Sequence, residues 1–187
     1  DAVRETGIKC RILSVGSSEE YGIVKNKDFS LSESTPLNPI SPYAVARVSQ
    51  ELLSKIYVDG YGLNIIMTRS FNHIGPRQEE VFAVSSFAKQ MVEIKKENRN
   101  KGTLRVGNLK IVRDFIDVRD VVKAYYLLLQ KGKNGEIYNV CSGKGIVLKE
   151  VINYIADYLK IKVELKVDKS LVRPNDNPVI IGNNKKI

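Results

Sequence analysis

Residues 9–18 read KCRILSVGSS, and residues 41–47 read SPYAVAR. The first segment is an apolar run that ends in small polar residues, which is how strands of an open parallel sheet end at the edge where ligands bind. In the second segment, Ser41 can cap a helix whose first residue is Pro42. A buried strand followed by a capped helix predicts an α/β fold built on a parallel sheet.

The rest of the chain continues this alternation of strands and helices. Helices are expected at residues 42–59, 82–97 and 148–159 and after a cap at Asp117, and strands at 63–71, 103–106, 113–116, 136–141 and 162–167. The first helix carries apolar side chains at helical period, which we expect to face the core. They are Val45, Val48, Leu52 and Ile56, and the second helix repeats the pattern with Phe87, Met91 and Ile94.

Three residues could act together on a carbonyl oxygen. Tyr43 and Arg47 are one helical turn apart and therefore lie on one face of the first helix. A cation at this distance stabilises a phenolate, which makes a tyrosine a useful proton donor to a carbonyl group. Ser17, where the strand ends, can give the same oxygen a second hydrogen bond. The alternative is that Tyr43 is a half-buried packing tyrosine.

Seven motifs carry a resemblance to a known family, and they are spread over nearly the whole chain. They are GSSEEYG at 16–22, NPISPYAVAR at 38–47, TRSFNHIGP at 68–76, FAKQMV at 87–92, VGNLKIVRDFIDVRD at 106–120, IYNVCSG at 137–143 and RPNDNP at 173–178. Together they resemble the extended short-chain dehydrogenase/reductases, the group of nucleotide-sugar epimerases, dehydratases and reductases. The resemblance implies the C-terminal portion of a Rossmann-type doubly wound parallel sheet with a smaller α/β substrate-binding lobe.

The resemblance also implies catalytic roles. Ser17 and Tyr43 match the family's catalytic serine and tyrosine, and Arg47 stands at the position of the lysine that binds the nicotinamide ribose. Because arginine is longer and planar, this exchange puts catalytic competence in question. Glu19 matches the acidic residue that acts as the sugar C5 base in dehydratases, and its alternative is a loop carboxylate at a strand end.

Five further residues are implied to bind ligands. Phe71, with Tyr43 and Arg47, is expected at the cofactor, which would be NAD or NADP. The substrate-binding set is Asn72 for the sugar, Arg113 and Arg173 for the pyrophosphate, and Asp176 near the nucleotide ribose. The alternative for each arginine is a surface salt bridge.

The resemblance implies NAD(P)H-dependent reduction of GDP-4-keto-6-deoxymannose. Alternatives are a GDP-mannose 4,6-dehydratase, a nucleotide-sugar epimerase, and a nucleotide-sugar-binding segment without turnover. We expect residues 1–74, with 115–132 returning, to form the second half of the Rossmann-type domain, and 75–187 to form mainly the sugar-binding lobe. Relatives associate through a helical bundle that includes the helix from Tyr43 to Asp59, so a homodimer is expected.

Folds of this type begin with a strand, a glycine-rich turn and a helix that holds the cofactor's pyrophosphate. The sequence has no such opening, and residues 1–7 resemble the end of a helix instead. We therefore expect the first half of the dinucleotide fold to lie outside this chain.

Composition sets further limits on this chain of 187 residues, which is 43% hydrophobic. No apolar run approaches 18 residues and no signal peptide is recognisable, which predicts a cytoplasmic protein without a membrane partner.

Cys10 and Cys141 lie in apolar runs and are expected to be buried free thiols. His73 is the only histidine, so no metal site is expected. The formal charge of +9 comes largely from scattered lysines, and a nucleic-acid partner is not expected.

Overall fold

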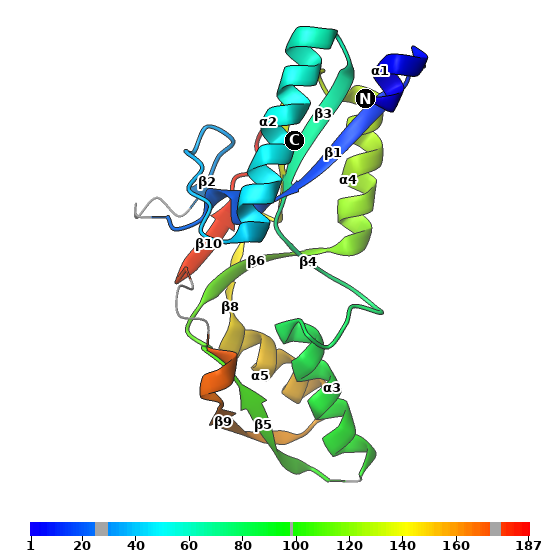
Figure 1. The fold of residues 1–187 in the computed structure, drawn as a ribbon. Coiled ribbons are helices and arrows are strands. Elements are labelled where there is room, and N and C mark those ends of the chain that lie inside the picture. The colour runs from blue at the N-terminus through cyan, green and yellow to red at the C-terminus, as the bar shows by residue number, and fades with distance from the viewer. Residues whose placement is uncertain (25–29, 98, 173–176) are drawn as a thin grey trace. The chain divides into compact units, whose positions relative to one another are not determined.

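The computed structural model describes residues 1–24, 30–97, 99–172 and 177–187. They form two compact units (Figure 1). Unit 1 comprises Asp1–His73, Asp114–Lys144 and Ile180–Ile187, and unit 2 comprises Ile74–Arg113 and Gly145–Val179. Residues 133–144 and 180–187, which the sequence analysis placed in the second lobe, therefore belong to the first unit.

Unit 1 is built on a parallel sheet whose strand order is β1-β3-β7. Its strands are β1 (Arg11–Ser17), β3 (Asn64–Ser70) and β7 (Ile137–Val140). Helices α2 (Pro42–Tyr61) and α4 (Val118–Lys131) pack on β1 and β3 and flank them in Figure 1. Because helices cover the sheet, β3 is buried at every residue except its first. These elements and the α/β fold class confirm the prediction from the sequence.

Helix α1 (Ala2–Thr6) lies where the sequence predicted the end of a helix, within residues 1–7. Six shorter elements were not predicted, because segments of two to four residues carry no measurable periodicity. They are η1 (Ser18–Tyr21), β2 (Ser30–Leu31), β4 (Asn72–Ile74), β8 (Gly145–Val147), η2 (Lys169–Leu171) and β10 (Val179–Gly182). A second sheet has the order β2-β10-β6-β4, in which β6 spans Val112–Asp117 and is also paired by β8. Asp117 caps α4 through the backbone N–H of Arg119, as the sequence predicted.

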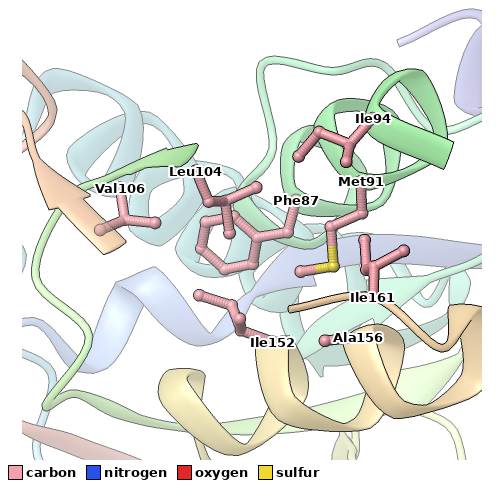
Figure 2. Packing of buried hydrophobic residues seen from close by; sticks show 8 residues of the cluster. All are labelled: Phe87, Met91, Ile94, Leu104, Val106, Ile152, Ala156 and Ile161. Atoms are coloured by element: carbon pink, nitrogen blue, oxygen red, sulfur yellow. The ribbon is translucent and has the colours of Figure 1, made fainter. Parts of the chain in front are cut away.

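Unit 2 packs helices α3 (Ala83–Lys96) and α5 (Leu148–Leu159) together with the parallel pair β5 (Lys101–Val106) and β9 (Lys162–Val167). Its core contains Phe87, Met91, Ile94, Leu104, Val106, Ile152, Ala156 and Ile161. Figure 2 shows the α3 side chains Phe87 and Met91 directed toward Ile152 and Ala156 of α5. The predicted apolar face of α3 is confirmed.

Helix α2 turns a different side toward the sheet from the one predicted. Three of its four expected core residues are 51–56% exposed, namely Val45, Leu52 and Ile56. The buried residues of α2 are Ala44, Glu51 and Ser54. Polar groups can face the sheet here because β1 offers partners: Gln50 and Ser54 donate to the Ser14 hydroxyl at 2.9 and 3.0 Å. The prediction of the core stripe on this helix was therefore wrong.

The two cysteines differ in their surroundings. Cys141 is buried, and burial raises the pKa of its thiol to about 12. Cys10 is exposed, because it precedes β1 rather than lying within it. The expectation of a buried Cys10 was wrong. Over the described ranges, no helix is both long and apolar enough to cross a membrane.

Candidate active site

Ser17 is held by two reciprocal hydrogen bonds where β1 passes into η1. Its Oγ accepts the backbone N–H of Glu19 at 3.2 Å, and its own N–H donates to Oε1 of Glu20 at 2.7 Å. This is a capping box, which satisfies two backbone donors at the start of η1. Ser17 therefore has a fixed backbone at the carboxyl end of the strand.

Two glycines permit this turn. A Cβ on Gly16 would lie 2.4 Å from Oε1 of Glu20 and 2.5 Å from the Thr68 carbonyl oxygen. Gly22, which ends η1, has φ of +58°, and a Cβ there would lie 1.5 Å from the Asn38 carbonyl oxygen. Side chains at either position would displace the backbone around Ser17.

Tyr43 and Arg47 are brought together on α2. Ser41 Oγ accepts the N–H of Ala44 at 3.1 Å, so the helix begins with Pro42 and Tyr43 lies in its first turn. The Tyr43 side chain is half exposed, and Cζ of Arg47 lies 5.0 Å from its ring centroid. The guanidinium therefore contacts the face of the tyrosine ring.

Arg47 also connects α2 to the strand that carries Ser17. Its Nη1 donates to Oε1 of Gln50 at 2.7 Å and to the carbonyl oxygen of Val15, two residues before Ser17, at 3.4 Å. Helix α2 packs against η1 as well as β1. The arginine thus keeps a positive charge near the end of β1.

Beneath this arrangement lies a buried charge cluster that we call the Arg69 cluster, formed by Arg69, Glu51 and Glu20. Arg69 of β3 donates from Nε and Nη2 to the two carboxylate oxygens of Glu51, at 2.8 and 2.7 Å. Glu20 Oε2 lies 3.8 Å from Arg69 Nε. All three residues are buried. The cluster joins β3 to both α2 and η1.

Burial dominates the electrostatics of the cluster. It raises the pKa of Glu20 to about 7, with a further increase from the neighbouring Glu51 carboxylate, while the Ser17 N–H and Arg69 act in the opposite direction. For Arg69, burial lowers the pKa, but Glu51 and Tyr21 together raise it well above the ordinary arginine value. Arg69 is thus a permanent cation, whereas Glu20 can change its charge near neutral pH.

The other predicted site residues of unit 1 have different surroundings. Glu19 is exposed on η1, and Asn72 is partly exposed on β4. The Phe71 side chain is only 1% exposed and packs with Tyr21 and Cys141 in a buried cluster. A contact from Phe71 to a cofactor would therefore have to come from its backbone.

Arg113 belongs to unit 2, at the start of β6, where it is partly buried. Its Nη1 donates to the carbonyl oxygens of Val112 and Asn177 at 2.9 and 2.7 Å. Arg173 and Asp176 lie outside the described residues. Among the residues with described positions, no three His, Cys, Asp or Glu side chains form a group that could hold a metal ion.

The sequence analysis missed all three members of the Arg69 cluster. Two signals were present. Glu51 continues the four-residue spacing of Tyr43 and Arg47 along one helix face, and Arg69 is a charge inside a strand of otherwise uncharged residues. A charged residue in a buried strand requires a buried counter-ion.

The full chain, residues 1–187, matches the family model described as GDP-mannose 4,6 dehydratase. It is 32% identical to GDP-6-deoxy-D-mannose reductase of Pseudomonas aeruginosa over 186 residues, which are 100% of this chain and 61% of that protein. It is 30% identical to GDP-mannose 4,6-dehydratase of Yersinia enterocolitica over 166 residues, 88% of this chain and 43% of that protein. The chain thus spans less than two thirds of either relative.

The fold is similar to a solved structure, that of RMD from Pseudomonas aeruginosa complexed with NADPH. The TM-score is 0.91 at 32% sequence identity, and the match covers 99% of this chain and 61% of that chain.

Removing the cation of the Arg69 cluster should destabilise the protein strongly. We expect Arg69→Met to lower the free energy of unfolding by about 3–5 kcal/mol, because it leaves the buried Glu51 carboxylate without a counter-ion. Urea denaturation measures the free energy of unfolding of the variant and of the wild type. The control is Arg119→Met, which removes an exposed ion pair with Asp117 and should change stability little. Equal effects of the two variants would contradict a stabilising role for the cluster.

Proposed function

The chain belongs to the GDP-mannose 4,6 dehydratase family, and on this premise we propose that it supplies the proton-donating and sugar-binding groups of an NAD(P)H-dependent GDP-sugar reductase. The observation that carries the proposal is the half-exposed Tyr43, stacked with the Arg47 cation on the helix that packs against the end of β1. Similarity to a GDP-6-deoxy-D-mannose reductase supports this choice.

The residues present fit the nicotinamide end of such a cofactor. A cation and an accessible phenol lie together on α2, and the ordered serine lies where β1 ends. The sequence contains no G-x-G-x-x-G turn for the pyrophosphate. When bound, the cofactor supplies a hydride to the carbonyl carbon of the sugar.

The chain's own residues donate a proton and a hydrogen bond to the oxygen of that carbonyl. Tyr43 donates its phenolic proton to the oxygen, and Arg47 stabilises the phenolate that remains. The Ser17 hydroxyl already accepts the Glu19 N–H, so its own proton is available for a hydrogen bond to the same oxygen. Ser17 thus stabilises the negative charge that develops during hydride transfer.

For the substrate we propose a GDP-sugar, specifically GDP-4-keto-6-deoxymannose. In this proposal Arg113 and Arg173 bind the pyrophosphate, for which arginine is the better bidentate partner. Asn72 contacts the sugar and Asp176 the nucleotide ribose.

Two other candidate functions have specific support. Glu19 is exposed two residues after Ser17, where a dehydratase needs a base, and the chain is similar to a GDP-mannose 4,6-dehydratase. A nucleotide-sugar-binding segment without turnover is favoured by two sequence features: an arginine at position 47, where the family resemblance implies a lysine, and the lack of a G-x-G-x-x-G turn.

The activity test uses the complete gene product that contains this chain, with NADPH or NADH consumption in the presence of GDP-4-keto-6-deoxymannose. We expect Tyr43→Phe to reduce kcat by about 10²–10⁴-fold, because the proton donor is lost. The control Tyr61→Phe, on the same helix, should retain activity. Activity that survives in Tyr43→Phe would contradict the reductase proposal.

Arg47→Lys should raise turnover, up to roughly tenfold, because the shorter ammonium group can approach both the phenol and the ribose. A lysine variant that is no faster than the wild type would show that arginine is an accepted substitute.

Binding of the nucleotide can be measured separately by titration calorimetry. We expect GDP to bind more tightly than GMP, because only GDP carries the pyrophosphate that Arg113 and Arg173 are proposed to hold. Arg113→Leu should remove most of this difference. Equal affinity for GDP and GMP would contradict the proposal that Arg113 and Arg173 bind the pyrophosphate.

We also propose that the exposed apolar stripe of α2 associates with a second copy of the chain. The stripe consists of Val45, Leu52, Leu53 and Ile56, each 51–56% exposed. Four large apolar side chains aligned on one helix face are typical of an interaction surface.

Sedimentation of the gene product tests this association. Leu52→Glu should shift the protein from dimer to monomer at micromolar concentration. The control Tyr154→Glu changes a side chain that is 76% exposed on α5, and it should leave the oligomeric state unchanged. A wild-type protein that is already monomeric would contradict the association.

A further inference from the structure

The side chain of Glu20 lies directly against the backbone of Ser17 and is completely buried. Its Oε1 accepts the Ser17 N–H, and this bond closes the capping box. Its Oε2 is also buried, and among the described residues it has no hydrogen-bond partner. The nearest cation, Arg69, is 3.8 Å from this oxygen.

One cation therefore faces two carboxyl groups. Both carboxylate oxygens of Glu51 already accept hydrogen bonds from Arg69, so the pair is neutral without Glu20. A second ionised carboxylate would leave a net negative charge in a site that excludes water. Burial and the proximity of Glu51 accordingly hold the pKa of Glu20 near 7.

The titratable and charged groups around Glu20 come from every element packed against it. Helix α2 contributes Glu51, strand β3 contributes Arg69, and η1 contributes Tyr21, whose ring centroid lies 4.9 Å from Cζ of Arg69. Glu33 also contacts Arg69: its carbonyl oxygen accepts Nη1, and its carboxylate accepts the Asn139 N–H. None of these groups supplies a further positive charge.

We propose that Glu20 is a positioning residue that acts in its protonated form: the neutral carboxyl group holds Ser17 and leaves Arg69 fully engaged with Glu51. This inference rests on the proposed reductase function. Once ionised, Glu20 competes with Glu51 for the guanidinium. Because Glu51 is on the same helix as Tyr43 and Arg69 is on the strand paired with β1, this competition alters the placement of Ser17 relative to Tyr43.

The direction of the pH effect follows from the raised pKa. An acid whose pKa is higher in the folded state contributes its full stabilisation below its ordinary value of 4.5, and loses it as the pH rises through about 7. Glutamine has the shape of the protonated acid and keeps the carbonyl acceptor for Ser17, but it cannot ionise. Glu20→Gln is therefore the variant that should preserve the arrangement at alkaline pH.

The direct test is an NMR titration of the complete gene product that contains this chain, followed at the Ser17 amide proton. In the wild type we expect an inflection near pH 7, because this proton is bonded to the Glu20 carboxyl group. The inflection should vanish in Glu20→Gln and persist in the control Glu136→Gln, which removes an exposed carboxylate. The wild-type titration can be interpreted even if the Glu20→Gln variant does not fold. An inflection near the ordinary glutamate value, or none, would overturn the proposal.

Activity of the gene product provides the second readout. Glu20→Gln should move the alkaline limit of the kcat profile to higher pH, whereas a purely structural role would lower kcat equally at all pH values and would count against the proposal. If the Ser17 inflection is present but no reductase activity is found, the proposed function fails and the protonated Glu20 is supported. The two ideas are therefore separable.

Discussion

The bidentate ion pair between Arg69 and Glu51 is the constraint on which the arrangement of unit 1 depends. It joins a buried strand to a helix with both partners shielded from water, a position in which charged groups are tolerated only when they are fully paired. The strand that carries Arg69 is paired in register with β1, and the helix that carries Glu51 also carries Tyr43. The pair thus holds the helix that carries Tyr43, the proposed proton donor, against the sheet whose strand β1 ends in Ser17.

This constraint also explains the orientation of α2. A helix that must bring Glu51 to Arg69 and Ser54 to Ser14 turns its polar side toward the sheet. Its larger apolar side chains are left on the opposite side, where they remain half exposed. The polar contacts between α2 and the sheet and the exposed apolar stripe on the opposite side of α2 therefore have the same cause, which is the orientation of the helix.

The regular elements could be predicted because their signals are local. Periodicity located the long helices and strands, and the caps at Ser41 and Asp117 marked two helix starts. Periodicity does not say which side of an amphipathic helix faces its own sheet, and for this reason the stripe that begins at Val45 was assigned to the wrong side. Cys10 was misjudged for a related reason, since an apolar run does not show where its strand begins.

The candidate site was predictable only in part. Ser17, Tyr43 and Arg47 belong to recognisable motifs, but the contact of Arg47 with the tyrosine ring depends on side-chain geometry that no motif encodes. The Arg69 cluster was missed because its members come from three segments of the chain. Glu20 is the clearest case, since its proton depends on the burial and charges that only the folded structure supplies.

A crystal structure of the complete gene product with NADPH and a GDP-sugar bound tests the central claim most directly. The account predicts that the Tyr43 hydroxyl and Ser17 Oγ both lie within hydrogen-bond distance of the sugar C4 oxygen, roughly 2.6–3.2 Å, with the Arg69–Glu51 pair intact beneath them. A sugar bound elsewhere, or a C4 oxygen that meets neither group, would contradict it.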